Sequence, residues 1–177
     1  MTSSTILHEP MAGMSATASR RAFSTELSFQ RVDGDVFWKA RFSGTDASSF
    51  AAKAVSDLWM VNAIYAHPMS PTTSVRVKGG LGASINRLQD IGEVTTNNQR
   101  YRLAPGRATS LAATLGVGVT QQLLPSVSIG ANVDANYFGA FETGSSRTES
   151  GLPRTINPYR LSSTWGGTVS GFLRVNF

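Results

Sequence analysis

Hydrophobic and polar residues alternate along the last segment of the chain. Between Ser162 and Phe177 the apolar residues fall on odd positions and the polar residues on even positions, with Phe172 as the one bulky exception. This period of two predicts a β-strand well beyond the roughly five or six residues of a typical globular strand. The apolar positions are Trp165, Val169, Leu173, Val175 and Phe177.

The same alternation predicts a hairpin near the start of the chain. Residues 23–31 and 36–43 each alternate, and Asp33-Gly34 lies between them. Asp-Gly between alternating segments is typical of a two-residue hairpin turn, so the two segments are predicted to be antiparallel neighbours. The cross-strand pairs of this register are Phe29 with Trp38 on the apolar face and Glu26 with Arg41 on the polar face.

Further alternating segments extend this pattern to the C-terminus. They are residues 59–67, 74–87, 110–122, 127–139 and 162–177. Short turns at 32–35, 68–73 and 123–126 alternate with long polar loops at 44–57, 88–108 and 141–160. Such an alternation of loop lengths predicts an antiparallel up-and-down β-barrel of the transmembrane kind.

The number of strands sets the domain organisation. Seven strands leave an even-numbered barrel one strand short, and Met11–Ala18 is the only candidate before Phe23. We therefore expect eight strands, with the first rising from the same end as the C-terminus. The predicted division is an N-terminal segment, 1–21, carrying that weak first strand, and a β-barrel domain, 22–177.

These strands, the loop pattern and the terminal sequence GFLRVNF resemble the bacterial outer-membrane β-barrel family. The length is similar to its small eight-stranded branch, the opacity-type and OmpA-like proteins. The resemblance implies a porin-like barrel architecture in the cell envelope, located in the bacterial outer membrane. It also implies an assembly signal for the barrel insertion machinery in the last strand, formed by Val169, Leu173, Val175 and Phe177. Residues 1–21 contain no secretory leader, and the sequence leaves open whether the chain is a whole barrel or part of a larger one.

Composition limits the alternatives. Only 15% of residues are charged, against about 25% in average globular proteins, and no apolar stretch approaches the roughly 18 residues of a membrane-spanning helix. The chain has no cysteine, which excludes disulfides and thiolate metal sites. The net charge of +5 comes from dispersed basic residues, so a nucleic-acid surface is not expected. Neither a cofactor nor a metal is predicted.

The two faces of the predicted strands suggest different surroundings. The apolar face would contact outer-membrane lipid, or form the core of a soluble β-barrel binding module, which is the alternative interpretation. The polar face would line a lumen too narrow for a wide pore. Its charges predict an ion-pair plug, or alternatively a narrow anion-preferring conduit. The predicted lumen ion network is Glu26, Lys39, Arg41, Arg76, Lys78, Asp134 and Arg174.

Candidate chemistry is sparse. The only histidines, His8 and His67, do not lie beside a serine in a triad pattern, so we predict no enzymatic activity. A small lipid-modifying outer-membrane enzyme is the second alternative. The expected function is structural or adhesive, or that of a subunit of a larger envelope complex, with the long loops contacting lipopolysaccharide or a protein partner. The predicted loop interaction residues are Arg100, Tyr101, Arg102, Arg107, Arg147, Arg154 and Tyr159.

Overall fold

The structure, a computed structural model, is all-β and describes residues 2–4, 13–20, 22–41, 47–149 and 151–175. Seven longer strands follow one another in a single antiparallel sheet, each hydrogen-bonded to the next. In that order they are β2 (Gly13–Arg20), β3 (Phe23–Arg41), β4 (Ala47–Pro68), β5 (Thr73–Thr95), β7 (Gly106–Leu124), β8 (Val127–Glu142) and β11 (Arg160–Val175).

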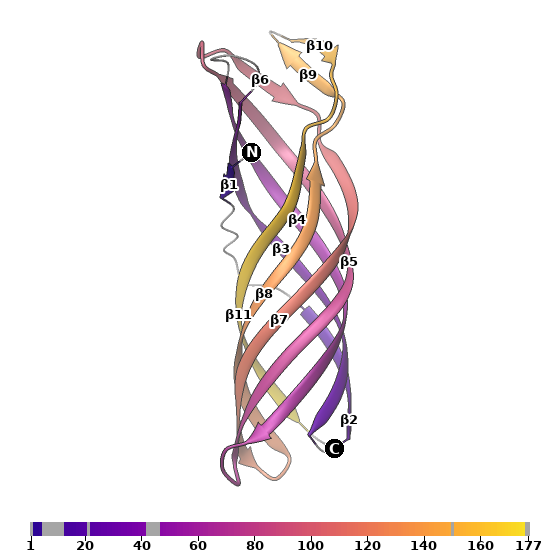
Figure 1. Cartoon of the computed structure of the whole chain (residues 1–177), viewed down its shortest axis with the longest axis vertical. Helices are drawn as coiled ribbons and strands as arrows, with labels where there is room; N and C mark the ends of the chain where they lie inside the picture. Colours follow the sequence, from indigo (N-terminus) through magenta and orange to yellow (C-terminus); the bar gives the residue numbers. More distant parts are fainter. Residues whose placement is uncertain (1, 5–12, 21, 42–46, 150, 176–177) are drawn as a thin grey trace.

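Four short strands extend the sheet at its upper end, the end opposite the C-terminus in Figure 1. β1 (Thr2–Ser4) pairs with the last residues of β3, and β6 (Arg100–Leu103) pairs with β5. β9 (Ser146–Glu149) and β10 (Leu152–Thr155) form a hairpin, and β9 pairs with β6. The long loops predicted at 88–108 and 141–160 are therefore partly ordered as β-structure.

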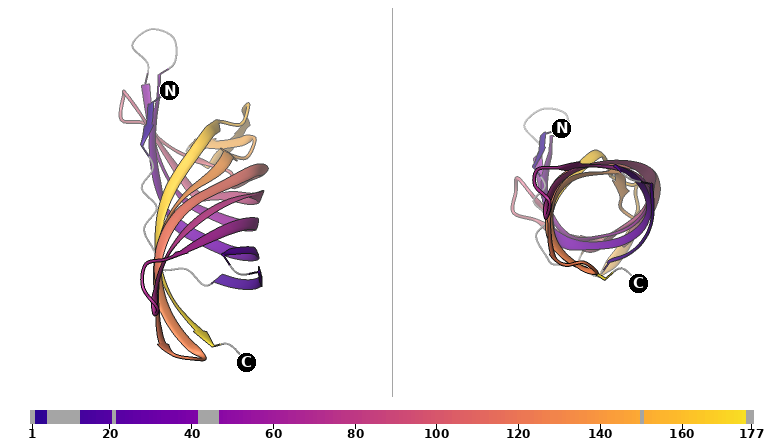
Figure 2. Two further views of the ribbon diagram at one scale, coloured as in Figure 1. Left: turned by 60° about the horizontal axis from the view of Figure 1, so that its bottom comes forward. Right: turned by 90° about the horizontal axis from the view of Figure 1, so that it is seen from below.

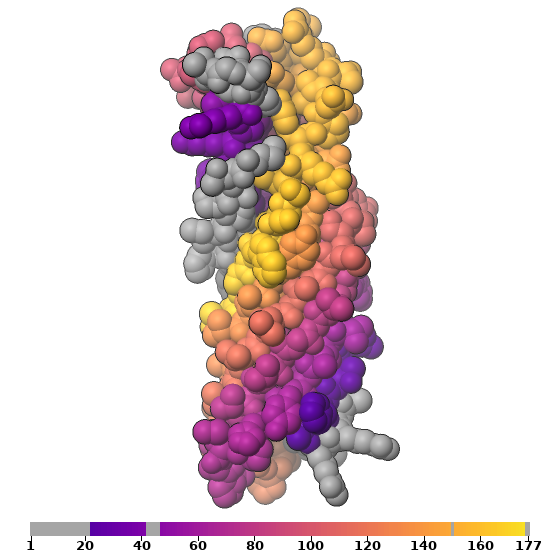
Figure 3. Space-filling view, in the orientation of Figure 1, coloured from indigo at the N-terminus to yellow at the C-terminus, as the bar shows by residue number. Residues whose placement is uncertain are grey.

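The long strands coil around a central space, as the view from below shows (Figure 2). Across the face visible in Figure 3, bands formed by β11, β8, β7 and β5 run diagonally, side by side. Within the described residues, however, β2 and β11 do not pair with each other. The all-β, antiparallel prediction is confirmed, while the sheet is not closed by hydrogen bonds.

The hairpin predicted at Asp33-Gly34 is wrong. Both residues lie in the middle of β3, where Asp33 pairs with Val55 and Gly34 with Ala54. A type I′ turn needs a positive φ at both central residues, and neither residue has one. The predicted loop 44–57 is mostly the first half of β4.

Loss of this turn changes the register and the direction of the first strand. Phe29 pairs with Trp59 rather than Trp38, and Glu26 pairs with Asn62 rather than Arg41. Since two predicted strands merge into one, the first strand runs downward, towards the end where the C-terminus lies (Figure 1). β2 confirms the predicted first strand over 13–18, while residues 11 and 12 are outside the described part.

The remaining predicted strands are confirmed, although the structure makes most of them longer. Segments 59–67, 74–87, 110–122 and 127–139 lie within β4, β5, β7 and β8. Segment 162–177 is strand as far as Val175, where the described residues end. The short turns predicted at 68–73 and 123–126 connect β4 to β5 and β7 to β8.

Candidate functional site

The two faces of β3 exchange their chemical character half-way along the strand. In its first half, Phe23 and Leu27 point outward and are exposed, while Glu26 points to the inner face. In its second half, Val36 and Trp38 are buried on the inner face, whereas the outward positions are mostly charged. Because side chains alternate along a continuous strand, this exchange reflects the sequence and not a twist of the backbone.

The outward apolar residues of the other strands continue those of β3 around the lower half. Leu115 is 65% exposed and Val169 is 79% exposed, which are large fractions for aliphatic side chains. We call this surface the apolar belt. It consists of Phe23, Leu27, Phe29, Trp59, Val61, Tyr65, Val77, Leu81, Leu111, Leu115, Val117, Val119, Ile129, Val133, Tyr137, Trp165, Val169, Leu173 and Val175.

Charged residues border the apolar belt at its upper edge on β3, β4 and β5. Arg31 pairs with Asp57 across β3 and β4, on the same outer face as the pair of Phe29 with Trp59 and two residues above it. Asp57 lies 2.8 Å from the guanidinium of Arg87 and 3.8 Å from that of Arg31. The change from aromatic to ionic surface therefore occurs within two residues along each strand.

The inner face of the lower half, which we call the polar interior, carries hydroxyls, amides and charges. Lys78 Nζ lies 3.0 Å from Asp134 Oδ1, and both side chains are largely buried. Asn62 donates hydrogen bonds to Glu26 (3.2 Å) and to Ser28 (2.9 Å). The polar interior consists of Ser24, Glu26, Ser28, Asn62, Arg76, Lys78, Thr114, Asn132, Asp134, Asn136, Thr168 and Arg174.

Two arginines of the polar interior contact an aromatic ring. The guanidinium carbons of Arg76 and Arg174 lie 5.1 Å and 5.8 Å from the centre of the Phe172 ring. Both distances are in the range of cation–π contacts. Phe172, the exception to the sequence alternation, is therefore an inward residue that holds two cations.

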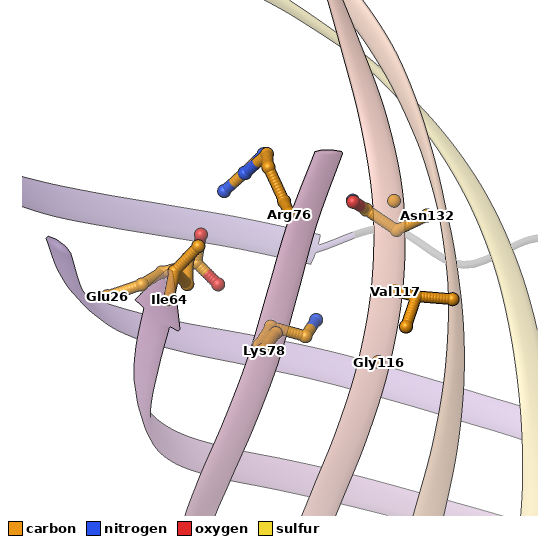
Figure 4. Close-up of a pocket in the computed structure, with 8 residues that line it drawn as sticks. Glu26, Ile64, Arg76, Lys78, Gly116, Val117 and Asn132 are labelled. Atoms are coloured by element: carbon orange, nitrogen blue, oxygen red, sulfur yellow. The ribbon is translucent and has the colours of Figure 1, made fainter. Parts of the chain in front are cut away.

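Little open space remains between these side chains. A cavity of about 20 Å³, about enough for one water molecule, is lined by Glu26, Arg76, Lys78 and Asn132 (Figure 4). The glycine at position 116 makes room for the ion pair, because a Cβ there would collide with Asp134 Oδ1. Side chains and ion pairs, rather than open space, therefore occupy this part of the polar interior.

The structure brings together five residues of the predicted ion network and excludes two. Glu26, Arg76, Lys78, Asp134 and Arg174 all lie in the polar interior. In contrast, the prediction is wrong for Lys39 and Arg41, which are exposed on the outer face of the upper half. The cause is the mistaken hairpin, since a two-residue turn places Phe29 and Trp38 on one face, whereas in the continuous strand all odd positions, including Lys39 and Arg41, share the outer face with Phe29.

The predicted assembly residues share one face of β11. Val169, Leu173 and Val175 are outward and exposed, as the alternation predicted. Phe177 lies outside the described residues.

Buried polar groups mark the boundary between the two halves. The pairing of β7 with β8 ends at Tyr137, and Gly139 adopts a positive φ of 74°. Asn86 donates to the backbone carbonyls of Phe138 (2.6 Å) and Ala140 (2.8 Å), and Ser84 also donates to the first of these (2.6 Å). These side chains satisfy carbonyls that the irregular strand leaves unpaired.

Above this boundary an apolar cluster, the upper core, fills the inner face. The Trp38 ring stacks on Phe50 with centroids 4.8 Å apart, and Tyr159 packs on Phe50 at 5.1 Å. Burial raises the pKa of the Tyr159 phenol, and the nearby Glu93 carboxylate adds to this effect. The upper core consists of Val32, Val36, Trp38, Ala40, Phe50, Ala52, Ala54, Leu58, Met60, Leu88, Ile91, Leu103, Ala112, Phe138, Phe141 and Leu161.

One buried carboxylate links the β9–β10 hairpin to the upper core. Glu93 is 2% exposed, accepts a hydrogen bond from Ser48 (2.8 Å) and lies 2.9 Å from Arg147 Nε on β9. The Arg147 guanidinium also lies 3.5 Å from the centre of the Tyr101 ring. The predicted loop residues Tyr101, Arg147 and Tyr159 therefore hold the upper end together.

Other predicted loop residues line a cleft at the upper end. It has a volume of about 480 Å³ and is lined by Gly92, Val94, Arg100, Arg102 and Thr148, among others. Arg100 and Arg102 are exposed and form no ion pair with another described residue. The other two predicted loop residues do not line the cleft, and both are exposed. Arg107 lies in β7, where it pairs with Arg87, and Arg154 lies in β10.

Sequence reasoning missed Glu93 and Asp57, because both fall in segments that were assigned to loops, where the facing of a side chain could not be derived. Asn86 falls in the predicted strand 74–87 on its polar face, but its bonds to backbone carbonyls were not foreseen. The signal that was available for Asp57 lies in 47–54, where Phe50, Ala52 and Ala54 share one face and Ser49 and Lys53 the other.

No metal site among the described residues and no similarity to a known protein indicates a function for the chain. The described residues contain no group of three or more His, Asp or Glu that could hold a metal ion. No helix in the described ranges has the length and apolar character needed to cross a bilayer. Comparisons with protein-family models, with curated proteins and with solved structures gave no significant match.

Proposed function

We propose that the chain is a non-enzymatic outer-membrane β-barrel protein with a plugged interior. The lower half lies in the bilayer, and the upper half projects from it and presents the arginine cleft to lipopolysaccharide or to a protein partner. The observation that carries the proposal is the apolar belt outside a polar interior. A soluble barrel has the reverse arrangement, with its apolar residues enclosed.

The dimensions of the apolar belt support a bilayer as its surroundings. On β5 the outward residues at the level of the apolar belt run from Val75, paired with Val119, to Ala83, paired with Leu111, and on β11 they run from Trp165 to Val175. These stretches match the roughly 9–11 residues that a tilted strand needs to cross the hydrocarbon layer. A contiguous apolar surface of this extent is rare on soluble monomers.

Aromatic pairs lie near the two edges of the apolar belt. Phe23 and Tyr65 have ring centroids 4.9 Å apart at the lower end of β3. Phe29 and Trp59 (4.6 Å) and the pair of Tyr137 with Trp165 (4.9 Å) lie higher. Amphipathic rings at two levels are typical of the interfaces of a membrane.

The interior supports a structural role rather than transport. The ion pair of Lys78 with Asp134 occupies the polar interior, and the upper core lies above it. Burying a charged pair has a high desolvation cost, which hydrogen-bonding groups around the pair offset, and the polar interior supplies such groups. The upper half, with its apolar interior and charged exterior, suits an aqueous environment outside the membrane.

Tryptophan fluorescence in lipid vesicles tests the proposal. Trp38, Trp59 and Trp165 are the only three tryptophans, and each can be kept alone by changing the other two to Phe. We expect brominated lipids to quench Trp59 and Trp165, which lie in the apolar belt, and to leave Trp38, which is 5% exposed in the upper core, nearly unquenched. Equal quenching of all three, or a protein that stays monomeric in water without detergent, would contradict the proposal.

A further inference from the structure

The directions of the strands leave the sheet one strand short of antiparallel closure. From β2 to β11 there are six successive pairings, and each of them is antiparallel. An even number of reversals makes the two edge strands run the same way, and Figure 1 shows both running downward. An all-antiparallel barrel has an even number of strands, and seven cannot close in this manner.

The two edges of β2 and β11 that are unpaired within the described residues face each other across a gap that we call the seam. In a bilayer these edges need a strand to pair with. In hydrocarbon, each unpaired backbone N–H or C=O group costs several kcal/mol, so open sheet edges do not occur facing lipid. A second copy of the chain in the same orientation does not solve this, because both of its edges also run downward. The strand that fits must run upward, antiparallel to both edges.

The charges next to the seam indicate which side chains the inner face of that strand should carry. Lys78 is paired with Asp134, and Glu26 is bonded to Asn62. Arg76 interacts electrostatically with the carboxylates of Glu26 and Asp134. Arg174 on β11 forms no ion pair with any carboxylate of the described residues, and its guanidinium contacts the Phe172 ring. A carboxylate entering from the seam would supply the charge that Arg174 lacks.

We propose that the seam binds an extended segment of a partner polypeptide as an eighth, upward-running strand. This inference rests on the proposed membrane location. The segment has about 9–11 residues, alternates apolar and polar side chains, and carries a carboxylate near its N-terminal, lower end, opposite Arg174. Its apolar side chains complete the apolar belt, and its polar side chains complete the polar interior.

A synthetic peptide with this pattern tests the proposal in lipid vesicles. The chain has no cysteine, so single-cysteine variants Val175→Cys (lower end of β11) and Trp165→Cys (upper part of β11) report the direction of binding. We expect a peptide with an N-terminal cysteine to form a disulfide with Val175→Cys, and one with a C-terminal cysteine to form it with Trp165→Cys. Val117→Cys on β7, which is paired on both sides, is the matched control and should not react.

The carboxylate is tested separately. Replacing the glutamate of the peptide by glutamine should weaken binding to the wild-type protein about tenfold, the effect of losing one charge-assisted hydrogen bond. The same replacement should have no effect on binding to Arg174→Gln. Equal affinity of both peptides for the wild-type protein would overturn this assignment.

Three further results would overturn the proposal. They are a peptide that does not bind, a peptide that cross-links in the opposite direction, and protection from exchange, in the protein alone, of those amide protons of β2 and β11 that face the seam rather than β3 or β8. The last result would mean that the two edges pair with each other. None of these results would change the lipid quenching of Trp59 and Trp165. The quenching experiment therefore tests the membrane location separately from the binding of a partner strand.

Discussion

Placing an arginine in the middle of the apolar belt tests the membrane location energetically. Leu115 points outward from β7, and its cross-strand neighbours are Gly79 and Ala135, which are too small to cover it. It lies four residues from both Leu111 and Val119, which is about 13 Å along the strand and about 9 Å of membrane depth at a tilt near 45°. An arginine side chain there cannot bring its charge fully out of the hydrocarbon.

The expected cost of Leu115→Arg is therefore about 2–4 kcal/mol, the value for a basic residue near the bilayer midplane. At about 1.4 kcal/mol per factor of ten, this lowers the folding equilibrium constant by roughly 30- to 700-fold. The assay is urea unfolding in phospholipid vesicles, followed by tryptophan fluorescence.

Thr109→Arg is the matched control, because Thr109 lies on the same strand and the same outer face, above the apolar belt. We expect its unfolding free energy to stay within about 0.5 kcal/mol of the wild type, as for ordinary surface positions. In a soluble protein both positions would be ordinary exposed surface, so both variants would keep the unfolding free energy of the wild type within about 0.5 kcal/mol. Equal stability of the two variants would refute the argument.

Three other predictions concern the interior and the upper end. Asp134→Asn leaves Lys78 as an unpaired buried cation and should cost about 3 kcal/mol, measured by urea unfolding, and adding Lys78→Met should restore most of it; no recovery would contradict the ion pair. Because the pKa of Tyr159 is raised, the folded state favours the neutral phenol, so the unfolding free energy holds below pH 10.0 and falls as the pH rises above it; Tyr159→Phe should remove this fall in urea unfolding above pH 10.0, and an unchanged fall would contradict the raised pKa. Glu93→Gln removes the ion pair that holds the β9–β10 hairpin, so trypsin should cleave at Arg154 at least several-fold faster than in the wild type, and an unchanged rate would contradict the role of that contact.

The lower half of the molecule could be predicted from the sequence because one rule governs it. Between Leu111 and Val119, and again between Ile129 and Tyr137, the outward residues are apolar and the inward residues are small or polar. The period of two therefore predicted both the strand and which of its side chains point inward. The inward facing of Lys78 and Asp134 followed from the same rule, but the sequence did not show that the two residues pair with each other.

The upper half could not be predicted because the rule reverses there. Val32, Val36 and Trp38 are inward, although the apolar residues of the same strand below them are outward. A hairpin at Asp33-Gly34 preserves a single apolar face, since it places Phe29 and Trp38 on the same side. The local turn signal and the assumption of one lipid-facing surface thus supported each other, and both were wrong at this position.

Substitution of Asp33 distinguishes the two interpretations directly. In the structure Asp33 lies on an exposed outer position of β3, paired with Val55, and its only ion pair among the described residues is a distant one, 3.8 Å from Arg31. Threonine has a higher strand propensity than aspartate, within a scale of about 1 kcal/mol. We therefore expect Asp33→Thr to leave the unfolding free energy unchanged or to raise it by up to about 1 kcal/mol. In a type I′ turn the same residue would need a positive φ, which a β-branched side chain disfavours. A clear loss of stability, above about 1 kcal/mol in urea unfolding, would support the hairpin and remove the basis for the reversal of the two faces.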